Sequence, residues 1–419
     1  MRIRLALIIP TLDRCGAEKQ LALLAAGLPS REFEVHVCAL TRGGPLEATL
    51  KSAGIPVTVI GKQRKIDPAA FFRLRRFLKE LRPDIAHTWL FAANSYGRLA
   101  ARQAGVPIII AGERCVDPWK RWHELAIDRL FARFTQRIVT NSAGVRDFYV
   151  ARGLPAEKFT IIPNGIEPPA GLMATMDTAD DAANSAPTAS TPTASSDKSP
   201  KTAVADPPTA VSMAVRQAAR ERLLRETGLP DTTRFVGAVG RLWPQKRYKD
   251  LIWAAELLRW PHPDTHLLII GEGPQRWRLQ RYTRQIGIAS HVHFLGARND
   301  VPSLLPALDC FWLASGYEGQ SNALMEAMSA GLPVVVSDIP GNRDLVVDGE
   351  SGLLVPPGNK SEFARRTRRL MDEPEYARRL GVNARRRMAD EFSLTRMIDR
   401  HAALYRELAG EIREPAAIG

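Results

Sequence analysis

The chain opens with the stretch MRIRLALIIPTLDRCGAEKQLALLAAGL, residues 1–28, in which an apolar run leads through a polar loop into an amphipathic segment. Ile3–Ile9 has the continuous branched apolar side chains of a strand that is buried on both faces. The polar loop Thr11–Cys15 follows it, and Glu18–Leu28 then has the apolar spacing of a helix. A buried strand followed by a loop and a helix is the repeating unit of a parallel sheet that helices cover on both faces.

The same alternation recurs in two blocks of the chain. Strand-like apolar runs in the first block are Glu34–Leu40, Pro56–Ile60, Ile85–Thr88, Pro107–Ala111, Arg137–Thr140 and Phe159–Ile162. Those in the second block are Arg234–Val239, His266–Ile270, Val292–Leu295, Asp309–Ala314, Pro333–Val336 and Gly352–Val355. Helical spacing fills the intervals, and a chain of 419 residues suffices for two domains of the usual roughly 100–200 residues. The pattern predicts an α/β fold with two doubly wound parallel sheets.

A change of composition separates the two blocks. From Ala170 to Met213 the residues are mainly Ala, Thr, Ser, Pro and Asp, and large apolar side chains are nearly absent. Such a segment cannot bury enough apolar surface to offset the entropy of ordering it. We therefore predict a Rossmann-like domain over 1–169, a disordered linker over 170–213, a second Rossmann-like domain over 214–392 and a final amphipathic helix within 393–419.

The formal net charge of +13 directs attention to anionic partners. A nucleic acid, an anionic membrane surface and a phosphorylated small substrate would each suit this charge. The chain contains no helix-turn-helix signature, finger-like Cys/His spacing or aromatic RNA-binding box, so we expect no nucleic-acid partner. The basic cluster Arg73, Arg75, Arg76 and Lys79 has two interpretations: a solvated helix face, or attraction to anionic lipid.

Cysteine usage and hydropathy bear on the location of the protein. Cys15, Cys38, Cys115 and Cys310 are scattered and form no CxxC pair, which is typical of reduced thiols in a cytosol. The first residues contain no signal-peptide core, and no apolar stretch approaches the ~18–20 residues that a membrane span needs. We expect a cytoplasmic protein, with peripheral contact on the inner face of an anionic membrane as the further interpretation of its charge.

The most informative motif is SGYEGQSNALMEAM, residues 315–328. It follows a predicted strand and opens a helix near Ser321, where free backbone N–H groups and the helix dipole favour an anion. Glu326, in the second turn, could accept hydrogen bonds from a vicinal diol such as a ribose, and Glu318 precedes the helix in a loop. The alternative is that Glu318 is merely solvated and Glu326 is an ordinary helix-face charge.

Two further loops follow predicted strands. GRLWPQKR, residues 240–247, places Arg241 and Lys246 where they could hold a diphosphate, and each charge-assisted hydrogen bond would contribute ~1.5–3 kcal/mol. The alternative is a solvated basic turn. Leu12–Glu18 contains Gly16, which would let the backbone approach a ligand closely, although a single glycine is more often simply a turn.

Taken together, these loops resemble those of the group 1 glycosyltransferases (glycosyltransferase family four), retaining enzymes of the GT-B fold. The resemblance covers nearly the whole chain outside the linker. Besides Gly240-Arg241 with Lys246 and the Glu318-to-Glu326 motif, its carriers are Pro163-Asn164-Gly165-Ile166, Gly331-Leu332-Pro333-Val334-Val335, Asp348-Gly349 and Gly352-Leu353-Leu354-Val355-Pro356.

The resemblance implies roles for these residues. Arg241 and Lys246 would hold the donor diphosphate, Glu326 the ribose diol, and Glu318 the sugar hydroxyls near the anomeric carbon. The other donor contacts would come from Gly16, Gly240, Gly319, Gln320, Ser321 and Asn322. The first domain would bind the acceptor, the second would bind the nucleotide sugar, and the final helix would return to the first domain. The chain contains no Asp-x-Asp, which fits an enzyme that uses neither a metal nor another cofactor.

Two departures from the family pattern concern the first domain. Cys15 replaces the first of two glycines often present before the first helix. Where many members carry a histidine, this chain reads Ala111-Gly112-Glu113-Arg114-Cys115, which leaves Glu113 and Arg114 as candidates on the acceptor side. His87 matches another frequent family position and is a catalytic candidate. Its alternative is a histidine whose hydrogen bonds are satisfied within the end of the sheet.

The predicted function is retaining transfer of a sugar from a nucleoside-diphosphate donor to a saccharide or lipid-linked hydroxyl, in the synthesis of cell-surface polysaccharide or glycolipid. The nucleotide base is left open between uridine and guanosine. Two alternatives remain: a sugar-nucleotide epimerase of similar fold, and a catalytically silent partner in polysaccharide assembly. A nicotinamide dehydrogenase is disfavoured because Gly271-Glu272-Gly273 continues to Arg276, where the dinucleotide fingerprint has a third glycine.

Overall fold

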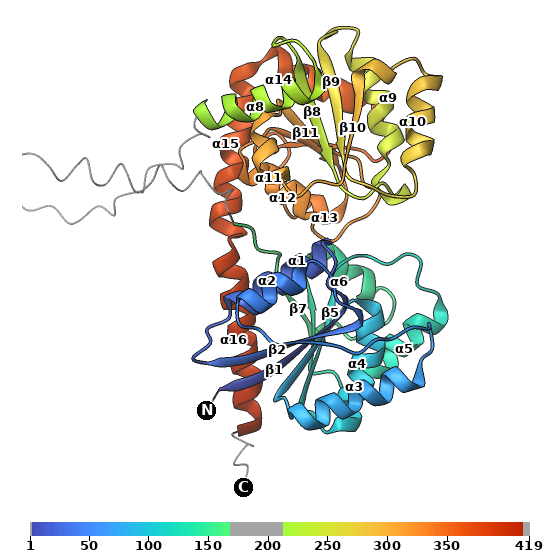
Figure 1. Ribbon diagram of the computed structural model, residues 1–419, viewed down its shortest axis with the longest axis vertical. Helices are drawn as coiled ribbons and strands as arrows, with labels where there is room; N and C mark the ends of the chain where they lie inside the picture. Colours follow the sequence, from blue (N-terminus) through green and yellow to red (C-terminus); the bar gives the residue numbers. More distant parts are fainter. Residues whose placement is uncertain (1, 168–212, 414–419) are drawn as a thin grey trace, which may run out of the picture.

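The computed structural model describes residues 2–167 and 213–413. The predicted linker over 170–213 falls, except for its last residue, outside the described residues. The described part consists of two α/β units, one on either side of this interval (Figure 1). None of the helices in 2–167 and 213–413 combines the length and the apolar character needed to cross a membrane.

The first unit is built on a seven-stranded sheet with the order β3-β2-β1-β4-β5-β6-β7. Every pairing in it is parallel. Its strands are β1 Ile3–Thr11, β2 Phe33–Arg42, β3 Val57–Val59, β4 Ile85–Trp89, β5 Ile108–Glu113, β6 Arg137–Thr140 and β7 Phe159–Ile161. Its helices are α1 Gly16–Gly27, α2 Leu46–Ser52, α3 Pro68–Leu81, α4 Leu90–Ala104, α5 Trp122–Ala132 and α6 Ala143–Val150.

The second unit is built on a six-stranded parallel sheet with the order β10-β9-β8-β11-β12-β13. Its strands are β8 Arg234–Val239, β9 Thr265–Ile270, β10 Val292–Gly296, β11 Cys310–Leu313, β12 Val334–Ser337 and β13 Leu353–Val355. Its helices are α8 Met213–Thr227, α9 Tyr248–Leu258, α10 Arg276–Gln285, α11 Val301–Leu304, α12 Asn322–Ser329, α13 Pro340–Arg343, α14 Lys360–Asp372 and α15 Pro374–Glu391. Two parallel sheets of this kind confirm the predicted α/β fold class.

Alternating side chains of β1 fill two separate cores. Leu5, Leu7 and Ile9 face α1 in one apolar cluster, whereas Ala6 and Ile8 belong to the cluster on the α3 and α4 side. This division follows from the two-residue period of a strand. The continuous apolar run that begins the chain therefore reflects burial on both faces of the sheet.

The last helix, α16 Leu394–Arg413, packs with the first sheet although it directly follows α15 on the second (Figure 1). The crossing is fixed by backbone hydrogen bonds between Ile166 N and Phe392 O (2.9 Å) and between Leu394 N and Ile166 O (3.1 Å). Beyond it, Met397 and Tyr405 enter the same apolar cluster as β1 and α1. The two units are thus joined at a second place, where the segment that ends the first unit pairs with the chain between α15 and α16.

Strand order reverses at one point in each sheet: between β1 and β4 in the first, and between β8 and β11 in the second. Ligands of open parallel sheets bind at such switch points, beyond the carboxyl ends of the strands. Most of the candidate residues lie in or directly after the loops that follow β1, β8 and β11, whereas His87, Glu113 and Arg114 belong to β4 and the end of β5. The topology therefore brings those candidates to ligand-binding positions.

Candidate active site

The loop after β8 is shaped by close backbone contacts. Gly240 has φ of +150° and accepts a hydrogen bond on its carbonyl from the Tyr248 hydroxyl (3.0 Å). A Cβ on Gly271, after the neighbouring β9, would lie 2.0 Å from the Gly240 carbonyl oxygen. Both positions exclude a larger residue. The contacts of the Gly240 carbonyl with Tyr248 and Gly271 therefore fix where the loop Gly240–Arg247 begins.

Lys246 and Glu318 form an ion pair between the loops after β8 and β11. The loops are further joined by hydrogen bonds from Gln245 Nε2 to Tyr317 O (2.7 Å) and from Gly316 N to Gln245 O (2.8 Å). The Lys246 side chain is 17% exposed and that of Glu318 is 10% exposed. Two candidates that lie 72 positions apart are thus brought together in a partly dehydrated place, where charges interact more strongly than in water.

Arg241 is exposed and stacks over the Trp243 ring, 5.3 Å from its centroid. Its positive charge reaches the first domain: it acts to lower the pKa of Glu18, although burial dominates and leaves that pKa raised. The same holds for the pKa of the Cys15 thiol. Arg241 therefore lies close enough to the start of α1, the region that contains Gly16, for its charge to act there.

The turn before α12 lies against the first domain. A Cβ on Gly319 would lie 2.1 Å from the Arg114 carbonyl oxygen and 2.8 Å from the Asn141 amide group. On its other side, a Cβ on Gly341 would lie 1.7 Å from the Gly319 carbonyl oxygen. Glycine is therefore required at position 319, where the turn before α12 passes between the first domain and Gly341.

Asn164 connects the two domains at the same level. Its backbone N–H donates to Gln320 Oε1 (2.8 Å), and its Nδ2 donates to Asn322 Oδ1 (2.9 Å) and Gln320 O (3.3 Å). Asn322 Nδ2 in turn donates to the Gly16 carbonyl (3.1 Å). The side chain of Gln20 on α1 makes two hydrogen bonds with the Gly165 backbone. Its Nε2 donates to the Gly165 carbonyl (2.8 Å), and its Oε1 accepts from the Gly165 N–H (2.9 Å). The candidates Gly16, Gln320 and Asn322 thus belong to one polar network.

Ser321 is the residue that precedes α12. Its side chain makes no capping hydrogen bond, and its backbone carbonyl accepts from Met325 N (3.1 Å). The first N–H groups of a helix lack partners within the helix, so they remain available to an anion.

Glu326 forms an ion pair with a residue that the sequence did not single out. Its Oε1 lies 2.5 Å from Lys19 Nζ, so the pair links α12 of the second domain to α1 of the first. The Glu326 side chain is 16% exposed and that of Lys19 is 39% exposed. Lys19 was missed because it lies 307 positions away, and no local pattern indicates such a contact.

Glu113 belongs to a buried charge network inside the first domain. Its carboxylate accepts from Asn94 Nδ2 (2.9 Å), Lys120 Nζ (3.3 Å) and the Tyr149 hydroxyl (3.0 Å). Burial raises the pKa of Glu113 to about 7, against the opposing charge of Lys120. These contacts hold the carboxylate within the first domain and do not bring it together with Glu318.

Arg114 lies at the domain interface. Its guanidinium stacks over Trp89 at 4.5 Å and donates to Asn164 Oδ1, while its carbonyl accepts from Asn141 Nδ2 (3.2 Å). Burial lowers its pKa to about 9. These contacts of Arg114 position the segment beside Gly319. The sequence suggested that Arg114 contacts the acceptor directly, and that role stays a prediction.

His87 lies in the core beneath α16. Its side chain is fully buried, and its Nδ1 lies 2.7 Å from the Tyr405 hydroxyl. Burial, reinforced by His401 and Arg114, holds its pKa well below the usual value. The structure does not bring His87 together with Lys246 and Glu318. Its Nε2 is buried without a hydrogen-bond partner among the described residues, so the alternative of a histidine satisfied within the sheet end is met only at Nδ1, and the catalytic role stays a prediction.

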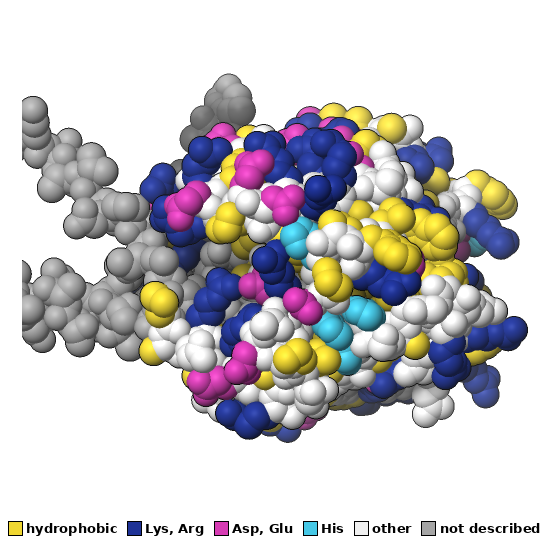
Figure 2. All heavy atoms as spheres, turned by 90° about the horizontal axis from the view of Figure 1, so that it is seen from above, with side chains coloured by type: hydrophobic (Ala, Val, Ile, Leu, Met, Phe, Trp, Pro, Cys, Tyr) yellow, Lys and Arg dark blue, Asp and Glu magenta, His cyan; other side chains and the backbone are white. Residues whose placement is uncertain are grey.

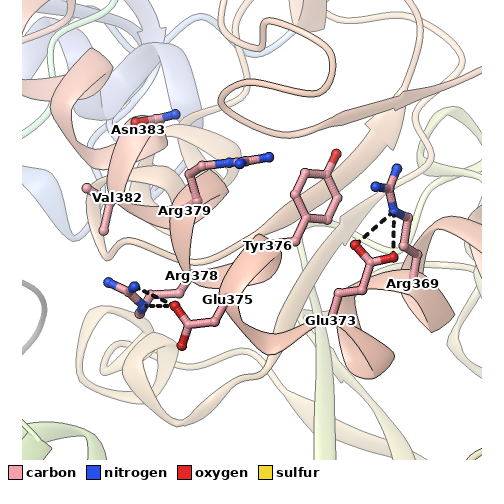
Figure 3. Close-up of a pocket in the computed structure, with 8 residues that line it drawn as sticks. All are labelled: Arg369, Glu373, Glu375, Tyr376, Arg378, Arg379, Val382 and Asn383. Carbon is pink, nitrogen blue, oxygen red and sulfur yellow. Dashed lines mark hydrogen bonds and ion pairs between the residues drawn. The ribbon is translucent and has the colours of Figure 1, made fainter.

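A surface pocket of about 460 Å³ lies elsewhere, between α14 and α15 (Figure 3). Its lining residues are Arg369, Glu373, Glu375, Tyr376, Arg378, Arg379, Val382 and Asn383, and none of the predicted site residues is among them. Arg369 pairs with Glu373, and Arg378 pairs with Glu375. Seen from above, this end of the molecule carries basic and acidic side chains next to one another (Figure 2). The candidate site is therefore the loop cluster between the domains.

Comparison with known families bears on the whole chain. The family model described as Glycosyltransferase Family 4 matches residues 15–168, and the model described as Glycosyl transferases group 1 matches residues 219–387. The chain belongs to the group 1 glycosyltransferases. A curated relative from Escherichia coli, UDP-Gal:alpha-D-GlcNAc-diphosphoundecaprenol alpha-1,3-galactosyltransferase, is 25% identical over 400 residues, which cover 90% of each chain. The alpha-D-kanosaminyltransferase of Streptomyces kanamyceticus is 32% identical over 46% of this chain and 50% of its own length.

Solved structures share the fold of this glycosyltransferase. The Anabaena protein Alr3699/HepE, solved in complex with UDP and glucose, superposes with a TM-score of 0.78 at 20% identity, covering 97% of this chain and all of that one. WaaG, a glycosyltransferase involved in lipopolysaccharide biosynthesis, superposes with a TM-score of 0.66 at 17% identity over 96% of this chain and 99% of that one. The predicted GT-B fold and the assignment as a glycosyltransferase that uses a nucleotide-sugar donor are confirmed.

Proposed function

We propose that this glycosyltransferase transfers a sugar, with retention of anomeric configuration and without a metal ion, to a hydroxyl of a lipid-linked saccharide during the synthesis of cell-surface polysaccharide or glycolipid. The observation that carries the proposal is the Lys246–Glu318 pair at the β8/β11 switch point, with the exposed Arg241 on the same loop. Two cations next to the start of α12 suit a diphosphate leaving group.

The proposed step involves one bond made and one broken. The acceptor oxygen bonds to the anomeric carbon on the face from which the diphosphate departs, and the bond from that carbon to the phosphate oxygen breaks. The acceptor proton passes to the departing phosphate oxygen. Arg241 and Lys246 stabilise the charge that develops on the diphosphate, and Glu318 holds the sugar hydroxyls. The Glu326 carboxylate accepts hydrogen bonds from the two ribose hydroxyls.

Release of nucleoside diphosphate tests this proposal. A panel of UDP-sugars and GDP-sugars is incubated with a polyprenyl-diphosphate-linked sugar and a chelator, and wild type is compared with Glu326→Ala. We expect release from one donor that is unaffected by chelator and lost in the variant. The matched control is Glu256→Ala, because Glu256 is 15% exposed and paired with Arg259 on α9, away from the site. Release that a chelator abolishes, or that Glu326→Ala leaves intact, would contradict the proposal.

A lipid-linked acceptor is supported by the surface of the first domain. Helices α3, α4 and α5 lie side by side (Figure 1). Within residues 62–133, all of which the structure describes, Glu80 is the one exposed carboxylate. The exposed cations there are Arg64, Lys65, Arg73, Arg76, Lys79, Arg82, Arg102, Arg121, Arg129 and Arg133. Exposed apolar side chains among them are Ile66, Phe72, Trp119, Trp122 and Leu130. Aromatic residues interleaved with cations suit the surface of an anionic membrane.

Vesicle binding tests the membrane contact. We expect cosedimentation with phosphatidylglycerol vesicles and not with phosphatidylcholine vesicles, and a roughly tenfold loss in Trp119→Ser/Trp122→Ser. The matched control is Trp260→Ser/Trp277→Ser. These tryptophans lie on the second domain and are 75% and 58% exposed, close to the 78% of Trp122 and 53% of Trp119. Equal losses in the two double variants would refute the assignment of this face.

A further inference from the structure

Lys19 is the residue through which the first domain reaches the proposed ribose ligand. It lies in the first turn of α1, and its ammonium is held 2.5 Å from Glu326 Oε1. A vicinal diol bound side-on donates one hydrogen bond to each carboxylate oxygen. The Glu326 side chain is only 16% exposed, and its Oε1 already contacts the Lys19 ammonium. Bidentate binding of the ribose would bring a hydroxyl to this same oxygen, in competition with Lys19.

The proposed diphosphate site borders the first turn of α1, which contains Lys19. One turn earlier, the Gly16 carbonyl accepts from Asn322 Nδ2 at the start of α12 (3.1 Å). Arg241 acts electrostatically on Cys15 and Glu18, which flank this turn. The cation proposed to bind the diphosphate, the helix start proposed to receive it and the first turn of α1 therefore surround one place.

We propose that Lys19 exchanges partners when the donor binds, leaving Glu326 for the ribose and pairing with the diphosphate. The inference rests on the proposed function and adds to it a third cation, contributed by the first domain. The nucleoside portion of the ligand must break the Lys19–Glu326 pair, whereas the phosphates gain an ion pair. Lys19 therefore opposes binding of a nucleoside and favours binding of its diphosphate.

The test is whether removing the Lys19 side chain changes the affinities for a nucleoside diphosphate and for a nucleoside in opposite directions. UDP and uridine are titrated against wild type, Lys19→Ala and Lys19→Arg at constant ionic strength, with GDP and guanosine used if the wild type binds only those. Lys19→Ala should bind the diphosphate about tenfold more weakly, because a charge-assisted contact is lost. It should bind the nucleoside up to about fivefold more tightly, because a partly exposed ion pair no longer competes. Lys19→Arg should stay near the wild type for both ligands.

Lys51→Ala provides the matched control. Lys51 is also a lysine paired with a glutamate, Glu47 at 2.7 Å, but both residues lie on α2 of the first domain. It should change neither affinity. If Lys19→Ala shifts both dissociation constants in the same direction, or shifts neither, the partner exchange is refuted while the proposed function stands. If the wild type binds neither diphosphate, the proposed function fails together with this inference.

Discussion

Replacing Lys120 with methionine tests the buried charge network that holds the segment after β5. The Lys120 side chain is fully buried, and its Nζ lies 2.9 Å from Asp128 Oδ2, 3.3 Å from Glu113 Oε1 and 3.7 Å from Asp117 Oδ2. The ammonium also lies 4.5 Å from the centroid of the Tyr149 ring. Methionine would fill most of the same volume but would leave buried carboxylates without this cation. Loss of one partner from a buried ion pair costs about 3–5 kcal/mol.

The loss of folding stability caused by Lys120→Met should grow with pH. Burial raises the pKa of Glu113 to about 7 in the folded protein, and Lys120 is the strongest influence in the opposite direction. Without Lys120 that pKa rises further. Between the unfolded pKa and the folded one, the folded state binds more protons than the unfolded state, so its stability falls as pH rises. Below the unfolded pKa the carboxyl is protonated in both states. In the wild type this fall in stability ends near pH 7, whereas in Lys120→Met it continues to a higher pH, so the deficit should be smallest below about pH 7 and should grow above it.

Urea unfolding followed by circular dichroism measures this deficit at several pH values. The control is Lys51→Met, the same substitution at a lysine that is 62% exposed and paired with Glu47 one helical turn away. An exposed pair of this kind contributes about 0.3–0.5 kcal/mol. If Lys120→Met costs no more than Lys51→Met, or costs the same at every pH, the argument from buried charge is wrong.

Three further substitutions test the site and the domain packing. Lys246→Ala should retain the circular dichroism spectrum and lower turnover ~100-fold or more, because a cation facing the leaving group is lost; undiminished turnover would contradict its proposed role. Gly319→Ala should lower both turnover and melting temperature, because the added Cβ would lie 2.1 Å from the Arg114 carbonyl oxygen. An unchanged melting temperature would show that the domains need not approach so closely. Tyr405→Phe should reduce the free energy of unfolding by about 1 kcal/mol, since its hydroxyl is 2.7 Å from His87 Nδ1; equal urea midpoints would refute this.

Much of the fold could be predicted because its signal is local. The strands recur as short apolar runs, and the observed bounds differ from the predicted ones by a few residues, as in Val57–Val59 against the predicted Pro56–Ile60. The final helix predicted within 393–419 is Leu394–Arg413 in the structure. Such shifts arise because hydrogen bonding decides where an element ends, whereas the sequence pattern records only which side chains are buried.

The sequence identified some residues of the candidate site and missed others. Those that it identified lie directly after the ends of strands. Lys246, Glu318 and Gly319 were identified because each lies in a loop directly after a strand, and parallel topology gathers such loops at one edge. Their roles in the reaction stay predictions. Lys19 could not be identified, because its significance depends on a glutamate 307 positions away.

The sequence by itself determined the two α/β units, the family and the loops that carry the candidate residues, because strand periodicity and motif spacing are properties of neighbouring residues. Only the tertiary structure decided how the units meet. The crossing of α16 buries His87 against Tyr405, and the docking of α1 on α12 gives Glu326 its cation. These contacts depend on rigid-body packing between elements hundreds of residues apart. Apolar burial drives that packing without direction, and local sequence patterns do not encode which polar side chains it will bring together.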